Sequence, residues 1–277
     1  MDSKELTVVI VTFRSESKIF DCLRSISNLA EIIVVENSNN NDLKKKLESK
    51  FSNLKCILTG ENLGYAAANN IGLKSVKTKY ALVLNPDTIL DENAIQRFLK
   101  SAERLKDFWL MGPSNDQMVE LEFEEKDLIE VNNLKGFAIF LNLSKFNNEY
   151  FDENFFLYFE EIDLCQKVKK NNGKIYLDRL IKINHDGSQS VNNLNKFELE
   201  KNRNWHWMWS TFYYHKKYKG FFLALIIIFP KLLSAFAKTL IYSILFNKNK
   251  RDIYFCRLSG IVNSIIGNKS WYRPSID

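Results

Sequence analysis

Three groups of acidic and histidine side chains in this 277-residue sequence could do chemistry together. Asp87 follows directly after an apolar run, the carboxylates Glu160 and Glu161 are adjacent, and His185 lies in a polar segment. Carboxylate and imidazole groups bind divalent cations such as Mn²⁺, and a carboxylate can also accept a proton as a general base. Whether these side chains meet depends on the elements that carry them.

Each group also has an ordinary structural explanation. Pro86 and Asp87 are typical turn residues, because proline removes a backbone donor and aspartate suits the start of the next element. Acidic side chains at the start of a helix are stabilised by its dipole, and a single loop histidine is usually just solvated. The predicted fold has to decide between these explanations and a site.

The first 115 residues alternate β-rich runs with helical patterns. Apolar residues recur at helical spacing after Ser15 or Ser17 and again across residues 95–105. This alternation predicts βαβ units, and therefore an α/β fold with a mainly parallel, Rossmann-like sheet flanked by helices. The predicted strands are Leu6–Phe13, Glu31–Glu36, Lys55–Thr59, Tyr80–Leu84 and Phe108–Gly112.

Polar residues follow each of the first four predicted strands. Ligands of parallel sheets bind at the carboxyl ends of the strands, so these residues are expected to form one polar pocket. The sequence contains neither G-x-G-x-x-G nor G-x-x-x-x-G-K-[ST], which excludes a dinucleotide fingerprint and a P-loop. The residues at these strand ends are Thr12-Phe13-Arg14, Glu36-Asn37-Ser38, Glu61-Asn62-Leu63-Gly64-Tyr65 and Asn85-Pro86-Asp87.

The second half of this region has a weaker pattern. Residues 114–130 are acidic and turn-like, and are predicted to form a loop. The later elements are predicted to be a strand over 134–143 that is interrupted at Lys135-Gly136, a helix from Phe159 to the C-cap signal Asn172-Gly173, a strand over Lys174–Leu177, and a loop that carries His185.

Helical spacing separates the carboxylates at the start of that helix. Asp163 shares a face with Lys167 and Lys170, which predicts an exposed ion pair. Glu161 instead shares its face with the apolar residues of the next two turns, and an aromatic run precedes it. Partial desolvation raises the pKa of a carboxyl group and suits a general base, so Glu161 is the carboxylate predicted to do chemistry.

Charge and hydrophobicity divide the chain near residue 200. Residues 201–277 carry 13 Lys and Arg against two acidic residues, a net charge of +11, while residues 1–200 carry 26 against 31, a net charge of −5. Within the basic part, residues 220–246 are almost entirely apolar but are divided by Pro230 and two lysines. With Trp and Tyr just upstream, this mixture predicts a helix pair lying in the headgroup region of a membrane, and it argues against nucleic acid. An ordinary buried helical hairpin is the alternative.

Composition and cysteine usage indicate a cytoplasmic protein. The chain is 45% hydrophobic, enough to bury the core of one large domain or of one domain with an appendage. Its four cysteines form no C-x-x-C pair, which fits a reducing compartment. The first residues lack a basic segment followed by a long apolar run, so we expect a first strand there and not a signal peptide.

The motifs, in chain order, are VVIVTFRS, IIVVENSNN, ENLGYAAANNIG, ALVLNPD, the Lys135-Gly136 strand, FDENFFLYFEEIDLCQKV and NHDGSQS. In this order and spacing they resemble the bacterial family 2 inverting glycosyltransferases of the GT-A fold, most closely the rhamnosyltransferase-like branch. The resemblance covers about residues 5–215. It implies a GT-A domain over residues 1–200, with a nucleotide-sugar-binding half at 1–115 and an acceptor or catalytic half at 116–200. A basic helical region follows at 201–277.

The resemblance implies a role for each motif. Glu161 matches the base that deprotonates the acceptor hydroxyl, and Asp87 matches the aspartate that binds Mn²⁺ or Mg²⁺ on the donor diphosphate. His185 matches a further metal ligand of some relatives. The residues implied to bind the nucleotide-sugar are Thr12, Phe13, Arg14, Glu36, Asn62, Gly64, Asn69, Asn85 and Asp87, and those implied on the acceptor side are Lys135, Gly136 and Glu160.

The implied reaction is a single displacement at the anomeric carbon. The donor would be a dTDP- or UDP-sugar, with rhamnose as the first candidate, and the acceptor a lipid-linked or growing glycan. The enzyme would work as a peripheral protein at the inner face of the cell membrane, and a homo-oligomer is compatible with it. Some positions depart from the family pattern, because Asn85 carries no charge and Glu161 replaces aspartate. A catalytically silent nucleotide-sugar-binding or scaffold subunit therefore stays open as an alternative.

Overall fold

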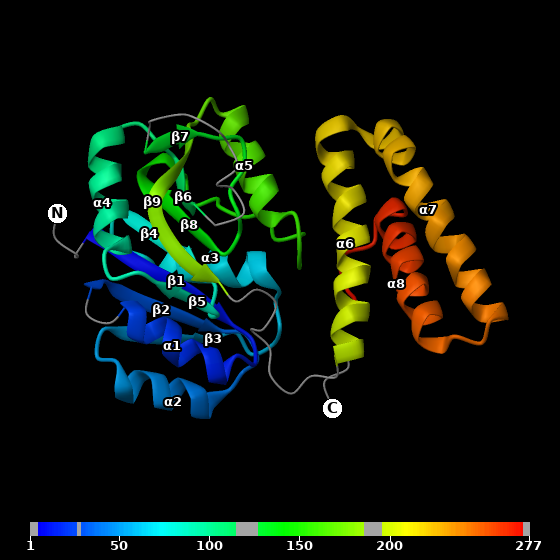
Figure 1. The fold of residues 1–277 in the computed structure, drawn as a ribbon, viewed down its shortest axis with the longest axis horizontal. Coiled ribbons are helices and arrows are strands. Elements are labelled where there is room, and N and C mark those ends of the chain that lie inside the picture. Colours follow the sequence, from blue (N-terminus) through cyan, green and yellow to red (C-terminus); the bar gives the residue numbers. More distant parts are fainter. Residues whose placement is uncertain (1–4, 27–28, 115–126, 186–195, 274–277) are drawn as a thin grey trace. The chain divides into compact units, whose positions relative to one another are not determined.

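The computed structural model describes residues 5–26, 29–114, 127–185 and 196–273 (Figure 1). The chain divides into two compact units, which we call the sheet unit and the helical unit. The sheet unit consists of Met1–Asp152 and Glu161–Asn192, and the helical unit of Glu153–Glu160 and Asn193–Asp277.

The first half of the sheet unit consists of the predicted βαβ units. Strand β1 lies between β2 and β4, β2 also pairs with β3, and all three pairings are parallel. The elements are β1 (Leu6–Thr12), α1 (Glu16–Ile26), β2 (Glu31–Glu36), α2 (Asn41–Lys50), β3 (Leu54–Leu58), α3 (Tyr65–Ser75), β4 (Tyr80–Leu84), β5 (Thr88–Leu90) and α4 (Ala94–Leu105).

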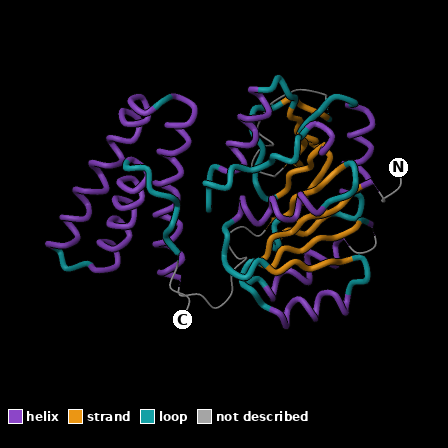
Figure 2. Tube along the Cα trace, turned by 180° about the vertical axis from the view of Figure 1, so that it is seen from behind, coloured by secondary structure: helices purple, strands orange, loops and turns teal. Residues whose placement is uncertain are grey.

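The second half of the sheet unit adds strands of mixed direction. Strand β8 is antiparallel to β4 and β6, β6 is parallel to β9, and the short strands β5 and β7 are antiparallel to β9. Within the described ranges they complete one nine-stranded sheet, in which eight strands have the order β3-β2-β1-β4-β8-β6-β9-β5 and the ninth, β7, pairs with β9 off this path. Figure 2 shows the sheet as one layer between helices. The elements are β6 (Leu110–Ser114), β7 (Leu128–Glu130), β8 (Ala138–Asn142), α5 (Glu160–Lys170) and β9 (Ile175–His185).

Alternating side chains of the sheet contribute to two hydrophobic cores, one on each face. In β1, Val8 and Ile10 face a core that also holds the apolar faces of α1, α2 and α4. Val9, between them, faces a second core that holds the apolar residues of α3 and α5. This is the two-residue period of a strand that is covered on both faces, and it explains why both faces of β1 and β4 are mainly apolar.

Several predicted boundaries in the second half are wrong. Strand β9 runs on to His185, so His185 ends a strand and does not lie in a loop. Within the predicted loop at 114–130, Leu128–Glu130 forms β7, while residues 115–126 lie outside the described residues. Both strands are held by pairing with distant partners, which a local pattern does not reveal.

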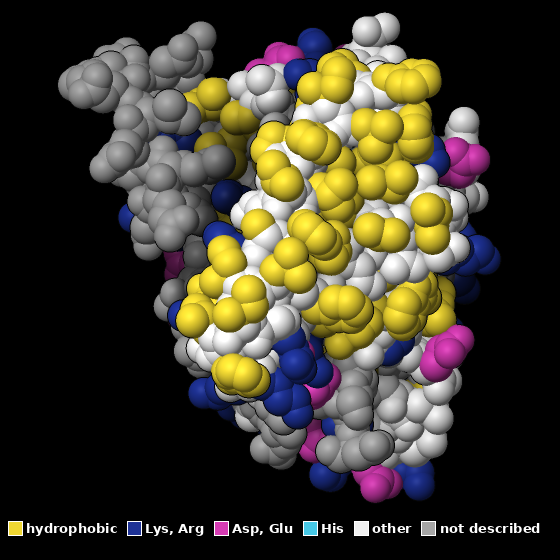
Figure 3. Space-filling view, turned by 90° about the vertical axis from the view of Figure 1, so that its right-hand side faces the viewer, with side chains coloured by type: hydrophobic (Ala, Val, Ile, Leu, Met, Phe, Trp, Pro, Cys, Tyr) yellow, Lys and Arg dark blue, Asp and Glu magenta, His cyan; other side chains and the backbone are white. Residues whose placement is uncertain are grey.

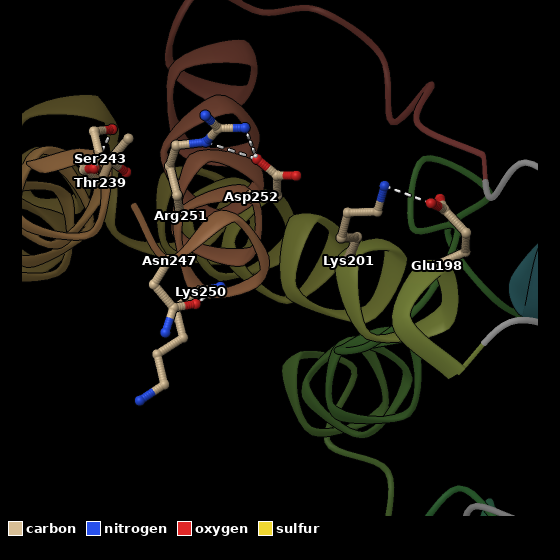
Figure 4. A network of polar contacts seen from close by, with 8 residues as sticks. All are labelled: Glu198, Lys201, Thr239, Ser243, Asn247, Lys250, Arg251 and Asp252. Atoms are coloured by element: carbon tan, nitrogen blue, oxygen red, sulfur yellow. Dashed lines mark hydrogen bonds and ion pairs between the residues drawn. The ribbon is translucent and has the colours of Figure 1, made fainter. Parts of the chain in front are cut away.

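The helical unit contains three long helices, α6 (Lys196–Lys219), α7 (Phe221–Ile244) and α8 (Lys248–Ile265). The prediction that Pro230 divides the apolar segment into two helices is wrong, because α7 continues through it. Ala224, Ile228 and Ala235 are buried on both sides of the proline, and this packing holds the helix together there. At the other end of α7, the Asn247 side chain caps α8 by accepting a hydrogen bond from the backbone N–H of Lys250 at 3.2 Å (Figure 4).

Close backbone contact joins α6 to α8. A Cβ atom added at Gly260 would lie 2.3 Å from the carbonyl oxygen of Trp205, so only glycine allows this approach. Next to it, the buried His206 ring bonds through Nδ1 to the Ser270 hydroxyl and through Nε2 to the Tyr272 carbonyl, both at 2.8 Å. Burial lowers the pKa of His206 to about 3, so the ring is neutral and serves to fasten the C-terminal segment.

Gly260→Ala is expected to destabilise the helical unit by about 1–3 kcal/mol, because its methyl group would overpack against rigid main chain. Urea unfolding followed by tryptophan fluorescence measures this, since four of the five tryptophans, all except Trp109, belong to the helical unit. Val262→Ala, on an exposed position of the same helix, is the control and should change stability by less than about 0.5 kcal/mol. A Gly260→Ala protein with unchanged stability would contradict the close packing.

Candidate active site

The strand register brings the predicted polar strand ends to one edge of the sheet. Thr12 lies opposite Glu36, and Glu36 lies opposite Leu58 at the end of β3. The backbone N–H of Asn37 donates to the Thr12 carbonyl at 2.8 Å, which ties the ends of β1 and β2 together. The convergence predicted from the parallel strands is therefore present in the structure.

At the end of β1, the three predicted residues differ in their surroundings. Thr12 is fully buried, and its hydroxyl has no hydrogen-bond partner among the described residues. Phe13 is half-buried, and Arg14 is exposed with a positive φ of 51°. A buried hydroxyl without a protein partner indicates a place where a ligand can donate or accept a hydrogen bond.

Glu36 is fully buried and holds its own turn. One carboxylate oxygen accepts the backbone N–H of Ser38 at 3.1 Å, and the other accepts that of Asn40 at 2.5 Å. Glu36 therefore stabilises the start of α2 and is also one of the residues predicted to bind the nucleotide-sugar. The Ser38 hydroxyl donates to the same oxygen as the Ser38 N–H, so within the described residues it is the oxygen bonded to Asn40 that keeps a second lone pair for a ligand.

The loop before α3 is organised by Asn37, which the sequence analysis did not single out as a binding residue. Its side-chain oxygen accepts from the backbone N–H of Leu63 at 3.0 Å, and its amide donates to Asn62 at 3.1 Å and to the Gly64 carbonyl at 3.3 Å. Gly64 then begins α3 with φ of 85°, a conformation that glycine adopts at little cost. Asn62 and Gly64 are thus brought together, through a buried amide.

Helix α3 contributes two adjacent buried asparagines. Asn69 donates to the Tyr65 carbonyl at 2.9 Å, and its side-chain oxygen has no partner among the described residues. Asn70, which sequence reasoning missed, donates to the Phe151 carbonyl at 2.9 Å and accepts the Phe151 N–H at 3.0 Å. This two-point contact fixes the chain shortly before the helix that carries Glu161.

The segment Asn85-Pro86-Asp87 is a turn, as the ordinary explanation predicts. The Thr88 N–H donates to the Asn85 carbonyl at 3.2 Å, and the Asn85 N–H donates to the Phe137 carbonyl at 2.9 Å. Asp87 is only 5% exposed, so the turn buries its carboxylate at the end of β4. Its charge and, to a larger extent, burial raise the pKa of the neighbouring Cys22 thiol.

The residues near Asp87 can bind a metal ion if a bound substrate supplies further ligands. The main chain of His185 lies opposite Thr88 in the β5–β9 pairing, next to Asp87, while the His185 side chain lies outside what the structure describes. The buried Thr88 hydroxyl has no partner among the described residues. In those same ranges no three His, Cys, Asp or Glu side chains gather into a metal site. A divalent cation there would need oxygen ligands from its substrate.

Glu161 lies next to Gly136, and the carbonyl of the following residue, Phe137, accepts the hydrogen bond from Asn85. A Cβ atom added at Gly136 would lie 3.6 Å from Cγ of Glu161, so the carboxylate side chain packs over that glycine. The Gly136 carbonyl accepts the Tyr65 hydroxyl at 2.7 Å. Burial raises the pKa of Glu161, although the positive charge of Lys135 and nearby backbone N–H groups act in the opposite direction. Its desolvation is the condition that a general base requires.

The other two carboxylates of α5 differ from expectation. Asp163 is 1% exposed, so the predicted exposed ion pair is wrong, and Lys167 instead pairs with Glu149 at 3.5 Å. The face of α5 that carries Asp163 is covered by tertiary packing, which helical spacing alone does not show. Glu160, at 6% exposed, is also buried at the start of the helix.

The helix ends as predicted, at the Asn172-Gly173 signal. Asn172 has φ of 55°, and the Gly173 N–H donates to the Val168 carbonyl at 2.9 Å. This left-handed residue followed by a long backward hydrogen bond is the Schellman arrangement.

Comparison with known sequences decides the family. The sequence model described as "Glycosyl transferase family 2" matches residues 7–165, which is more than half of the chain. The chain belongs to this family. The match spans β1 to the first half of α5, and so it contains the strand ends, the Asn85-Pro86-Asp87 turn and Glu161.

The name of one similar protein describes a sugar-transferring enzyme. The chain is 26% identical over 195 residues to the "Low-salt glycan biosynthesis hexosyltransferase Agl10" of Haloferax volcanii, which covers 61% of this chain and 62% of the relative. The chain therefore spans less than two thirds of that protein's length.

Solved structures show that the fold is the GT-A fold. The mannosyltransferase PcManGT from Pyrobaculum calidifontis, in complex with GDP-Man and Mn²⁺, has a TM-score of 0.56 at 12% identity and covers 94% of this chain and 87% of that one. S. aureus TarS 1-349 in complex with UDP-GlcNAc has a TM-score of 0.51 at 15% identity and covers 97% and 93%. At such identities the likeness concerns the fold alone, and the predicted α/β architecture is confirmed by it.

Glu161→Gln is expected to raise the melting temperature near pH 7 to 8. Because burial raises the pKa of Glu161 in the folded protein, its contribution to stability is complete below the unfolded value of about 4.3 and is lost as the pH rises through the folded value. The amide carries no charge, so the difference from the native protein should shrink as the pH falls toward 4. Thermal melts across this range measure it, with the exposed Glu31→Gln as control. A destabilised Glu161→Gln at pH 8 would show that the carboxylate is favourably bound.

Proposed function

We propose that this protein transfers a sugar from a nucleoside-diphosphate sugar to a hydroxyl of a growing or lipid-linked glycan, with inversion at the anomeric carbon. Glu161 acts as the general base. The observation that supports this most strongly is its position: a desolvated carboxylate packs on Gly136, and the adjacent Phe137 carbonyl holds the Asn85-Pro86-Asp87 turn at 2.9 Å. A base and a diphosphate site on neighbouring backbone suit a direct displacement.

The chain's own residues perform the remaining steps. Thr12 and Asn69 offer the donor buried polar atoms that have no partner among the described residues, and the loop ordered by Asn37 binds its phosphates. Asp87, with His185 beside it in the β5–β9 register, is proposed to hold Mn²⁺ or Mg²⁺. When bound, such a cation supplies Lewis-acid stabilisation of the charge on the leaving diphosphate. Lys135 lies close enough to influence Glu161 and faces the acceptor side.

The donor is proposed to be a hexose or deoxyhexose carried on dTDP or UDP, with rhamnose as the first candidate to test. The names of the relatives give the range to screen, since PcManGT was solved with GDP-Man and TarS with UDP-GlcNAc. A thermal-shift screen of dTDP-, UDP- and GDP-sugars with Mn²⁺ or Mg²⁺ identifies the donor, because binding raises apparent stability in proportion to affinity.

With that donor, Glu161→Gln is expected to lower the rate of sugar transfer by about 10²–10⁴-fold while donor binding persists, since only the proton acceptor is lost. Asp87→Asn is expected to lose the metal-dependent part of donor binding as well as transfer. Glu31→Gln, an exposed carboxylate on β2, is the matched control for both. Radiolabelled or mass-spectrometric transfer assays measure the rates. Full activity of Glu161→Gln would remove it from the mechanism, and metal-dependent binding without any turnover would favour a silent subunit.

We also propose that the helical unit binds the inner surface of the cell membrane. The outward side of α7 is apolar along its whole length, and Figure 3 shows apolar side chains gathered over one broad face with basic residues at its margins. The large exposed apolar residues on α7 include Phe222, Leu223, Ile226, Phe229, Leu233, Phe236, Leu240, Ile241 and Ile244. Phe255 and Val262 on α8, and Ile266 at its C-cap, are also exposed.

The chemistry of this face favours an anionic bilayer over a protein partner. Lysines stand at both ends of α7, at 216, 217 and 219 before it and at 248 and 250 after it, and the unit carries few acidic residues to oppose them. Each basic residue near an anionic surface contributes about 1 kcal/mol, and the apolar face adds burial in the acyl region.

The helical unit is proposed to lie in the plane of the membrane. Within the described residues, α7 is the one helix whose length and composition would allow it to cross a bilayer. Its inner side, however, already packs in one cluster with Phe212 of α6 and Ile261 of α8. A helix that packs against protein on one side and exposes apolar side chains on the other fits an interfacial position.

Phe229→Glu is expected to reduce binding to phosphatidylglycerol-containing vesicles by about tenfold or more, because it loses the burial of a phenyl ring and introduces a charge into the apolar face. Leu180→Glu is the control, since Leu180 is a similarly exposed apolar residue in the sheet unit. Vesicle flotation at low and physiological salt measures binding. Equal flotation of both variants would contradict the proposal, and so would a concentration-dependent dimer that Phe229→Glu dissociates.

A further inference from the structure

The chain just before α5 lies along α6 within the helical unit, and we call residues Phe155–Phe159 the aromatic strap. Every residue of the strap contacts α6. The contacts are Phe155 with Tyr213 at 4.9 Å between ring centroids, Phe156 with His206 at 4.5 Å, the Leu157 carbonyl with the Ser210 hydroxyl at 3.0 Å, Tyr158 with Trp207 at 5.3 Å, and Phe159 with Trp207 at 5.4 Å and Tyr214 at 5.3 Å.

Two consecutive strap residues have an unfavourable backbone conformation. Tyr158 has φ of 70° and Phe159 has φ of 72°, the left-handed region that bulky residues rarely adopt. Each such residue costs about 1–2 kcal/mol, and the conformation persists only where surrounding contacts impose it. In the helical unit both rings contact Trp207, which sits 44% exposed on α6.

The strained pair leads directly into the helix that carries the proposed base. Glu160 is both the residue after Phe159 and the first residue of α5, and Glu161 follows it. If Tyr158 and Phe159 relaxed to the ordinary φ of about −65°, each would rotate the chain by roughly 130°. The strained pair therefore sets how the strap backbone enters Glu160, the residue directly before Glu161.

We propose that Trp207 is a positioning residue for Glu161, acting by holding Tyr158 and Phe159 in the left-handed conformation that starts α5. This rests on the proposed role of Glu161 as the general base. The ring contacts of Trp207 with Tyr158 and Phe159 are the route by which it acts. Ser210, which holds the Leu157 carbonyl, supports the same turn from the next turn of α6.

Trp207→Ala tests the proposal in the full-length protein. A misplacement of about 1 Å can cost roughly 10²-fold in rate, so kcat should fall by about tenfold or more. Donor affinity, measured by thermal shift with the donor and Mn²⁺, should stay unchanged. The proposed donor site is built from the strand ends of the sheet unit and not from the strap. Trp207→Phe keeps an aromatic ring on the strap and should restore most of kcat. Trp271→Ala removes a tryptophan of similar exposure that has no contact with the strap in the described residues, and it should behave as the native protein.

A matched pair at Phe159 separates the backbone from the ring. Phe159→Asn and Phe159→Val both delete the ring, but asparagine tolerates positive φ while a β-branched residue resists it. If the left-handed backbone positions Glu161, the Asn variant should retain a kcat about tenfold above that of the Val variant. Equal kcat for the two variants would overturn the proposal.

The outcomes distinguish this inference from the proposed function. If Glu161→Gln is inactive and Trp207→Ala equals the native protein in kcat, the positioning role is wrong and the base assignment stands. If Glu161→Gln is active, the base assignment fails first. A parallel loss of donor affinity and kcat in Trp207→Ala would indicate general damage and would also overturn the positioning role.

Discussion

One short stretch of main chain, Gly136-Phe137, connects the parts of the proposed site. The Phe137 carbonyl accepts the Asn85 N–H, the Gly136 carbonyl accepts the Tyr65 hydroxyl, and Glu161 packs over Gly136. These contacts join the turn of Asp87, the start of α3 and the start of α5. They exist because β8 runs antiparallel beside β4, so the chain entering β8 passes the carboxyl end of β4. The site therefore depends on β8, a strand that departs from the parallel βαβ pattern.

The sequence predicts the first half of the fold well because periodicity and burial agree there. Strands β1 to β4 are apolar on both faces, and the apolar stripes of α1 and α4 match the faces they bury. The later strands carry no such signal. Strands β5 and β7 have three residues each, and they exist through pairing with β9, about 50 to 100 residues away in the chain. Tertiary contact, and not local propensity, decides such elements.

The sequence predicts those site residues whose positions follow from local patterns, and it misses those whose roles depend on distant contacts. Strand-end logic places Thr12, Glu36 and Asp87 at one edge, and helical spacing places Glu161 above a buried stripe. Neither pattern reveals the hydrogen bonds of Asn37 and Asn70, whose partners lie up to 81 residues away. Asp163 shows the converse, since its spacing from Lys167 predicted an exposed pair while tertiary packing covers it. A polar side chain's partner is a property of the fold, and the sequence shows only its capacity to bond.

The four residues from Tyr158 to Glu161 combine two unfavourable features, a left-handed backbone on aromatic residues and a desolvated carboxylate. Neither stabilises the folded state, so both must be offset by contacts elsewhere. For the aromatic pair those contacts come from α6, and for Glu161 they come from packing on Gly136 and from the charge of Lys135. Local rules are commonly broken where a protein does chemistry, because a reactive group needs surroundings that a merely stable fold would avoid. Two such features, adjacent at the start of one helix, support the proposed role of Glu161 as the general base.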